Sequence, residues 1–305
     1  MYDHQSKGIS YTAGFFMLIA FAIAGLIFAG IISGPIWEGM TGKSVKALAD
    51  SSFDPADSTA YKILQAINQV FGYFIPTFLT AFVLHRKPFR LLGYVPGFSS
   101  SQGILVLLIM IFALLVSGGL SYVNHELPIP ADWRLKFDGW EADYLKQVEA
   151  IVNLQTGADF FIALLIMAIL PAICEETLFR GGLQNFLTRS TRNPVLAILI
   201  VSLIFSAVHF SFYGFLSRFF LGIILGLLYH YSGRMWPNIL AHFLNNGIVL
   251  VALYIYKQQG KPVDQTMNEV EAGWWGLLAL PVVMVLMKLF KRKAESTHPD
   301  FNNGS

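Results

Sequence analysis

About eight apolar stretches, each close to 20 residues long, constrain the fold of this chain more than any other feature. A helix needs about 20 predominantly apolar residues to cross the hydrocarbon core of a bilayer. We expect eight such spans, at residues 13–33, 60–84, 103–123, 158–187, 194–210, 215–231, 236–256 and 274–290. The sequence therefore predicts an all-α fold, a polytopic membrane helical bundle with about eight transmembrane helices.

The composition agrees with a bilayer environment. Hydrophobic residues make up 55% of the 305 residues and charged residues only 13%, whereas about 25% of a typical soluble domain is charged. The net charge of +2, without a basic stretch rich in aromatics, argues against a nucleic-acid partner. The single cysteine, Cys174, excludes an internal disulfide and a cysteine-based metal cluster.

Lys and Arg gather in alternate connections between the spans, which indicates the orientation of the chain. Cytoplasmic loops of membrane proteins hold the excess of basic residues. The basic residues concerned are Arg86, Lys87, Arg90, Arg189, Arg192, Arg234, Lys288, Lys291, Arg292 and Lys293. The opposite connections are longer and more acidic, and the longest of them, 124–157, is expected at the opposite interface. Both termini are therefore expected to be cytoplasmic, with His85 at the surface of the first basic loop.

The first apolar run is expected to be a retained anchor. Its apolar part exceeds the roughly 7–15 residues of a signal-peptide core. No internal repeat and no soluble domain is apparent in the rest of the chain.

Three charged residues interrupt the span 158–187, namely Glu175, Glu176 and Arg180. A charge at mid-bilayer costs about 2.5–3.5 kcal/mol or more, so these groups are expected to face the bundle interior and to pair with one another. Glu176 and Arg180 are four residues apart and share a helical face, which predicts an ion pair. Glu175 lies about 100° around the helix and is left to meet another helix.

Two later spans carry histidines at helical spacing from other residues. Phe205 and His209 are expected to share one face at the end of the span 194–210, and His242 can share a face with Asn245 or Asn246. A single histidine or amide of this kind commonly serves as an interhelical hydrogen bonder. Three such elements on neighbouring spans indicate one buried site. In the span 60–84, Asn68 and Gln69 are expected to hydrogen-bond within the bundle.

The three motifs together resemble those of a known family. Glu-Glu-x-x-x-Arg, Phe-x-x-x-His and His-x-x-x-Asn are similar to the motifs of the CAAX protease and bacteriocin-processing family, whose membrane-embedded members include the type II CAAX prenyl endopeptidases. The matching residues are Glu175, Glu176, Arg180, Phe205, His209, His242 and Asn246. The resemblance implies a helical bundle with a cavity open to the cytoplasm, and peptide hydrolysis.

The resemblance also divides the chain into three parts. Residues 1–157 are expected to form N-terminal transmembrane helices and loops, and residues 158–256 the catalytic helical core. Residues 257–305 are expected to hold the last transmembrane helix and a basic cytoplasmic tail.

Peptide hydrolysis needs an activated water, a stabilised oxyanion and a proton for the leaving amine. We expect Glu175 to act as the general base, while the Glu176–Arg180 pair orients the motif. His209 would hold the same water or shuttle its proton. His242 and Asn246 would donate to the oxyanion. This mechanism needs no cofactor.

Zinc is the alternative chemistry, because two histidines and a glutamate suit a catalytic zinc with an open water position. A His-Glu-x-x-His helix is absent from the sequence, which favours the metal-free mechanism. Two other functions stay open, a non-catalytic scaffold or bacteriocin-immunity factor, and a transporter. The substrate is expected to be a peptide or protein, either prenylated or carrying a leader peptide.

Overall fold

The computed structural model describes residues 5–49, 54–152, 154, 156–260 and 273–297, and these residues are almost wholly helical. The α-helices are α1 (Tyr11–Thr41), α2 (Val45–Ala49), α3 (Ser58–Ile67), α4 (Ile75–Leu84), α5 (Pro88–Leu91), α6 (Ser100–His125), α7 (Ala131–Ile151), α8 (Gly157–Ala163), α9 (Leu170–Glu176), α10 (Asn185–Thr191), α11 (Pro194–Ala207), α12 (Phe215–Ser232), α13 (Met235–Gln258) and α15 (Leu280–Thr297). Among the described residues no β-strand forms, and one isolated bridge pairs Ser6 with His85.

Seven helical stretches in the described part of the chain are long and apolar enough to cross a membrane. They are Tyr11–Thr41, Pro55–Leu84, Ser100–His125, Gly157–Thr191, Phe215–Ser232, Met235–Gln258 and Trp274–Ser296. The remaining predicted span, 194–210, corresponds to α11, an apolar helix of only 14 residues. The predicted polytopic helical bundle is therefore confirmed, and the protein is an integral multi-pass membrane protein.

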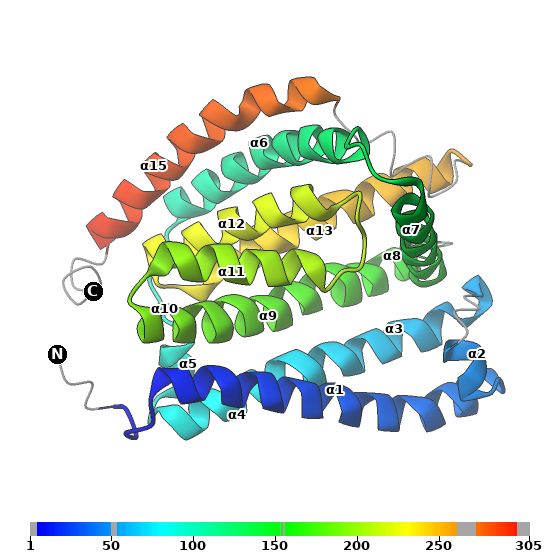
Figure 1. Cartoon of the computed structure of the whole chain (residues 1–305), viewed down its shortest axis with the longest axis horizontal. Helices are drawn as coiled ribbons and strands as arrows, with labels where there is room; N and C mark the ends of the chain where they lie inside the picture. The colour runs from blue at the N-terminus through cyan, green and yellow to red at the C-terminus, as the bar shows by residue number, and fades with distance from the viewer. Residues whose placement is uncertain (1–4, 50–53, 153, 155, 261–272, 298–305) are drawn as a thin grey trace.

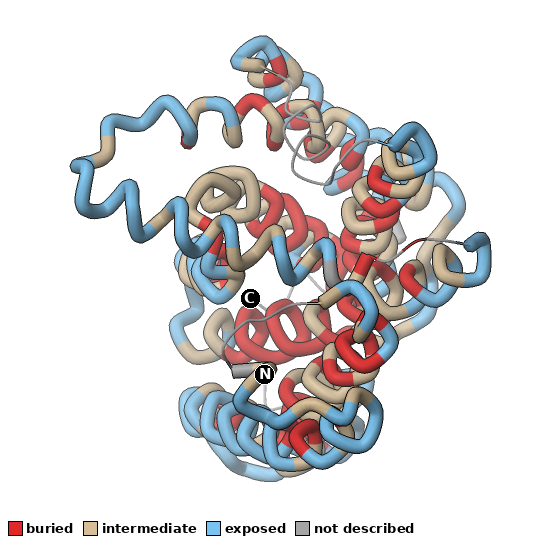
Figure 2. Tube along the Cα trace, turned by 90° about the vertical axis from the view of Figure 1, so that its right-hand side faces the viewer, coloured by how far each residue is buried: buried red, intermediate tan, exposed pale blue. Residues whose placement is uncertain are grey.

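The long helices run side by side, from α1 and α4 at one edge through α9 to α13 in the middle and α15 at the other edge (Figure 1). α1 begins and α15 ends at the same end of the bundle, and α7 crosses the opposite end (Figure 1). Buried residues line the faces between helices, whereas the outer faces are exposed (Figure 2). Exposed apolar faces of this kind suit contact with lipid chains.

Two of the long helical stretches contain three π-helical segments, whose hydrogen bonds run from residue i to residue i+5. These segments are η2 (Asn68–Phe74), η3 (Leu164–Ile169) and η4 (Thr177–Gln184). π-Segments are rare and occur frequently at functional sites. α1 approaches η2 very closely, since a Cβ at Gly25 would lie 2.0 Å from the carbonyl oxygen of Phe71. Only glycine fits at that crossing.

Two apolar clusters enclose the middle of the bundle. One joins α6, α12, α13 and α15, with Val106, Leu228 and Phe290 buried in it. The other joins α1, α4, η4, α10 and α11, with Leu18 and Phe186 at its centre. Close packing and interhelical hydrogen bonds hold such bundles together in lipid.

His85 was expected at the surface, and this expectation is wrong, because its relative exposure is 5%. The chain before α1 folds back over the end of α4. The backbone N–H of Lys7 donates to the carbonyl of Leu84, and that of Arg86 donates to the carbonyl of Gln5. The segment before α1, held by these hydrogen bonds, therefore covers His85.

Candidate active site

Glu176 is the centre of a buried polar cluster, and its side chain is 0% exposed. Its Oε1 accepts a hydrogen bond from Nη1 of Arg180 at 2.8 Å and one from Nδ1 of His242 at 2.7 Å. Its Oε2 accepts from Nδ2 of Asn238 at 3.3 Å. The ion pair expected from the i,i+4 spacing is thus present, and it is joined to α13. Three donors, one of them charged, compensate the desolvation of this carboxylate.

Arg180 ties the cluster to two further helices. Its Nη2 donates to the carbonyl of Gly222 in α12 at 3.3 Å. Its guanidinium lies over the ring of Phe205 in α11, 4.8 Å from the ring centroid. A cation over an aromatic face is attracted by the ring quadrupole. Arg180 therefore fixes η4 against α11 and α12.

Glu175 lies in different surroundings from its neighbour. Its side chain is 12% exposed. Its Oε1 accepts a hydrogen bond from Nε2 of Gln69 at 2.8 Å, and its Oε2 lies 3.8 Å from Nε2 of His242. The imidazole of His242 therefore stands between the two glutamates. Because a carboxylate only accepts, the hydrogen bond to Glu176 places a proton on Nδ1 of His242 and leaves Nε2 towards Glu175.

The prediction that Phe205 and His209 share one face of a helix is wrong in its geometry. α11 ends at Ala207, because the chain turns there and Phe210 adopts a positive φ of 49°. Phe205 and His209 are nevertheless in contact, because Nδ1 of His209 donates a hydrogen bond to the carbonyl of Phe205 at 2.7 Å. The ring of Phe205 also contacts both imidazoles, with centroid distances of 5.1 Å to His209 and 6.0 Å to His242.

The two candidate amides of α13 bond to each other and to backbone. Nδ2 of Asn245 donates to Oδ1 of Asn246 at 3.0 Å, and Nδ2 of Asn246 donates to the carbonyl of Met167 at 3.2 Å. Among the described residues neither amide bonds to a glutamate. Asn246 therefore holds α13 against η3, and Asn245 orients the amide of Asn246.

Sequence reasoning missed Asn238 and gave Gln69 only a general role. Asn238 precedes His242 by four residues, so the spacing rule that paired His242 with Asn246 also applied on its other side. The expected hydrogen bond of Gln69 within the bundle is present, but its acceptor is Glu175 itself. The side-chain oxygen Oε1 of Gln69 is buried and has no hydrogen-bond partner among the described residues.

The donors beside Glu175 have the chemistry of zinc ligands. Each imidazole uses Nδ1 for another hydrogen bond, which is the usual arrangement when Nε2 binds a metal. Within the described residues, however, no three or more His, Cys, Asp or Glu side chains are close enough to share one ion. The donor types fit zinc, and their present spacing does not.

An apolar groove of about 350 Å³ lies against the first half of α13. It is lined by Phe98, Ile169, Trp236, Ile239, Leu240 and Phe243. Ile239 and Phe243 lie within one helical turn of His242. The first half of α13 therefore carries both groove-lining residues and His242 of the cluster.

Comparison with known proteins confirms the resemblance over one part of the chain. Residues 157–248 match the sequence profile of the family described as type II CAAX prenyl endopeptidase Rce1-like. A protein of Bacillus subtilis (strain 168), called uncharacterized protein YpbD, is 32% identical over 92 residues, which represent 28% of this chain and 42% of YpbD. The match thus spans less than half of that relative. No solved structure matches the chain significantly.

Proposed function

We propose that this protein is a membrane-embedded endopeptidase in which Glu175 activates the water that attacks a peptide bond. The observation that supports this assignment is the unequal environment of two adjacent glutamates. Glu176 is fully buried and bound by three donors, so it cannot reach a substrate. Glu175 is partly exposed and faces the free nitrogen of His242.

The attacking water would lie against Glu175 and His242. The carboxylate of Glu175 accepts one proton of the water while the water oxygen bonds to the carbonyl carbon of the substrate. Glu175 then delivers this proton to the peptide nitrogen as the C–N bond breaks, which releases the amine and leaves the enzyme unchanged. His209, held by the carbonyl of Phe205, would orient the same water or shuttle its proton.

His242 and Asn246 would stabilise the oxyanion. Nδ1 of His242 bonds to Glu176 and its Nε2 lies beside Glu175, where an N–H on Nε2 would donate to the oxyanion. Removing a single oxyanion donor typically lowers the rate by about 100–1,000-fold.

The apolar groove beside α13 supports a lipidated or apolar peptide as the substrate class. A lipidated peptide would place its chain in this groove and its scissile bond at Glu175. Both a prenylated C-terminal peptide and an apolar leader peptide meet this requirement. Hydrolysis of each in detergent by the purified protein distinguishes the two.

Both termini are assigned to the cytoplasm. The basic connections all lie at the end of the bundle where α1 begins and α15 ends (Figure 1), and basic loops stay on the cytoplasmic side. Cys174 is the single cysteine and is buried, so a maleimide should label only a cysteine introduced at the surface. Ser190→Cys should be protected from an impermeant maleimide added outside intact cells, whereas Lys136→Cys should react.

The decisive experiment compares Glu175→Gln with Glu149→Gln, a matched change at an exposed position of α7. Peptide release from membranes is measured by comparative peptidomics, and the fold is checked by thermal melting. We expect Glu175→Gln to lose about 1,000-fold or more of the cleavage rate, and Glu149→Gln to lose none. Unchanged cleavage or an unchanged cellular phenotype in Glu175→Gln would rule out Glu175 as the general base.

Zinc-dependent peptide hydrolysis by the same residues is the second candidate. It is supported by the hydrogen bonds that Nδ1 of each histidine makes, which leave Nε2 to bind a metal. His209, His242 and Glu175 would have to move closer together to hold zinc, which would then supply a water of lowered pKa. Metal analysis of the purified protein separates this candidate from the metal-free mechanism.

A further inference from the structure

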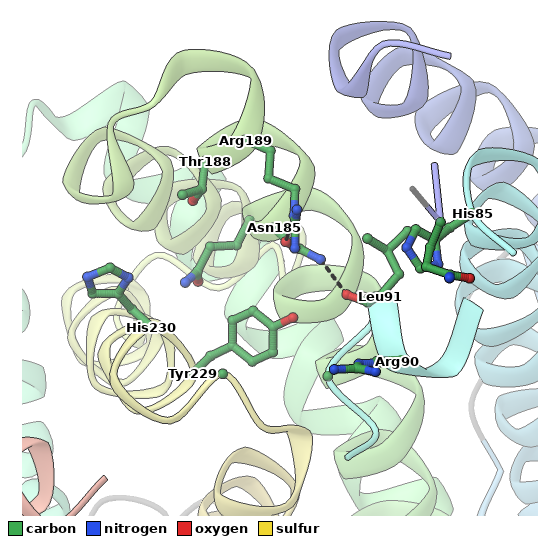
Figure 3. Close-up of a pocket in the computed structure, with 12 residues that line it drawn as sticks. His85, Arg90, Leu91, Asn185, Thr188, Arg189, Tyr229 and His230 are labelled. Carbon is green, nitrogen blue, oxygen red and sulfur yellow. Dashed lines mark hydrogen bonds between the residues drawn. The ribbon is translucent and has the colours of Figure 1, made fainter. Parts of the chain in front are cut away.

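A second cleft opens at the end of the bundle that holds the basic connections, away from Glu175. Its volume is about 340 Å³, within the range of small-ligand pockets. The end of α4, the short helix α5 and the ends of α10 and α12 form its walls, and Figure 3 shows the side chains that surround it.

The walls of this cleft are joined by buried hydrogen bonds. Nδ2 of Asn185 in α10 donates to the carbonyl of Leu91 in α5 at 2.7 Å (Figure 3). The hydroxyl of Tyr229 in α12 donates to the carbonyl of Leu92 at 3.3 Å. Gly93 has a φ of +89°, and a Cβ there would lie 2.9 Å from the ring of Tyr229. The cleft is therefore a fixed feature of the fold.

The charge of the cleft is positive. Its positive charge comes from Arg90 and Arg189, and none of its described lining residues is Asp or Glu. Nε of Arg189 donates to Oδ1 of Asn185 at 2.8 Å, and its guanidinium lies 5.0 Å from the centroid of Tyr11. Both partners of Arg189 are neutral, so they orient its charge without cancelling it.

We propose that this cleft binds a phosphate group at the cytoplasmic membrane surface. Two guanidinium groups offer the forked donors that match phosphate oxygens. Basic pockets between transmembrane helices near the cytoplasmic surface bind anionic lipid headgroups. The headgroup of an anionic phospholipid and free phosphate share this chemistry. Neither source depends on the proposed peptidase activity.

Thermal melting of the full-length protein in neutral detergent tests the proposal. The probes are phosphatidic acid, inorganic phosphate, and phosphatidylcholine as the neutral lipid, all at one ionic strength. A ligand that binds only the folded protein raises the melting temperature. We expect phosphatidic acid or inorganic phosphate to raise it and phosphatidylcholine to leave it unchanged. Stabilisation by phosphate alone identifies free phosphate as the source, and stabilisation by the lipid alone identifies the headgroup.

The matched variants are Arg90→Gln, Arg90→Gln with Arg189→Gln, and Lys288→Gln with Arg292→Gln as a basic control outside the cleft. Arg90 and Arg189 are exposed, so the folded bundle should persist. Loss of each arginine should weaken phosphate binding by about tenfold or more. Full stabilisation of the double cleft variant, equal stabilisation by phosphatidylcholine, or no effect of either phosphate probe on the unmodified protein would overturn the proposal.

Discussion

Nε2 of Gln69 donates a 2.8 Å hydrogen bond to Oε1 of Glu175, although 106 residues separate them in the chain. Gln69 is 2% exposed and lies in the π-helical segment η2. The bond holds one carboxylate oxygen of Glu175, while the other faces His242. Gln69 therefore fixes the direction in which the proposed base presents its free oxygen.

Gln69→Met should lower kcat and leave KM almost unchanged, because it removes the donor while keeping a similar volume. A hydrogen bond to a charged group is worth roughly 1.5–3 kcal/mol, so we expect a loss of about tenfold to a hundredfold. Steady-state cleavage of a lipidated peptide measures it. Gln65→Met, one turn earlier in α3, is the matched control. An unchanged kcat in Gln69→Met, with an intact melting transition, contradicts the positioning role.

Glu176→Gln should mainly lower the stability of the folded protein. The change leaves Arg180, which is 1% exposed, without its carboxylate. Breaking a buried ion pair in this way costs about 3–5 kcal/mol. Thermal melting should show a large drop for Glu176→Gln and little change for Glu175→Gln.

The double variant Glu176→Gln with Arg180→Met supplies the control for this prediction. Replacing both charges removes the uncompensated guanidinium, so part of the lost stability should return. Equal melting temperatures for Glu175→Gln and Glu176→Gln would show that the two acids do not differ as described.

The sequence predicted the helical bundle and the Glu176–Arg180 pair because each depends on local information. Apolar length predicts a span, and i,i+4 spacing predicts a shared face. The bond between Gln69 and Glu175 depends on how two distant helices pack, which no spacing rule contains. The turn that ends α11 before His209 could not be predicted either. Phe210 has a positive φ there, and phenylalanine is not a residue type that indicates this conformation.

Asn246→Ala should impair cleavage far more than Asn245→Ala if Asn246 supplies an oxyanion donor. Loss of one such donor costs about 100–1,000-fold in kcat. Asn245 only donates to Oδ1 of Asn246, so its loss should cost about tenfold or less. Rates for the two variants on one peptide give the comparison. A larger effect at Asn245 would reverse the assignment.

Metal removal should leave the cleavage rate unchanged under the proposed glutamate mechanism. Dialysis against a strong chelator, followed by metal analysis and a rate measurement, provides the test. Stoichiometric zinc, with activity lost on its removal and regained on its addition, would establish the zinc mechanism instead.

Lys43 links the end of α1 to the start of the next span, and this link should depend on pH. Its Nζ lies 2.9 Å from Oδ2 of Asp54 and 2.6 Å from Oδ2 of Asp57. The hydrogen bond from Lys43, followed by that from the backbone N–H of Ala56, lowers the pKa of Asp54 below its ordinary value. The hydrogen bonds to Asp57 and Asp54 raise the pKa of Lys43 above its ordinary value.

The signs of these shifts define a pH window. A lowered carboxyl pKa contributes stability above the unfolded value of about 3.9, and the contribution is lost as the pH falls through the folded value. A raised lysine pKa contributes stability below about 10.4, and that part is lost as the pH rises through the folded value. The link should therefore act between about pH 4 and pH 10.

Lys43→Ala should lower the melting temperature by roughly 1–2 °C at neutral pH, because exposed ion pairs contribute little. The difference between this variant and the unmodified protein should shrink as the pH falls below about 4, where Asp54 takes up a proton. Lys46→Ala, an exposed lysine of α2, is the matched control and should show no such difference. A difference that stays constant from pH 7 down to about pH 3 would mean that Lys43 acts through packing and not through its charge.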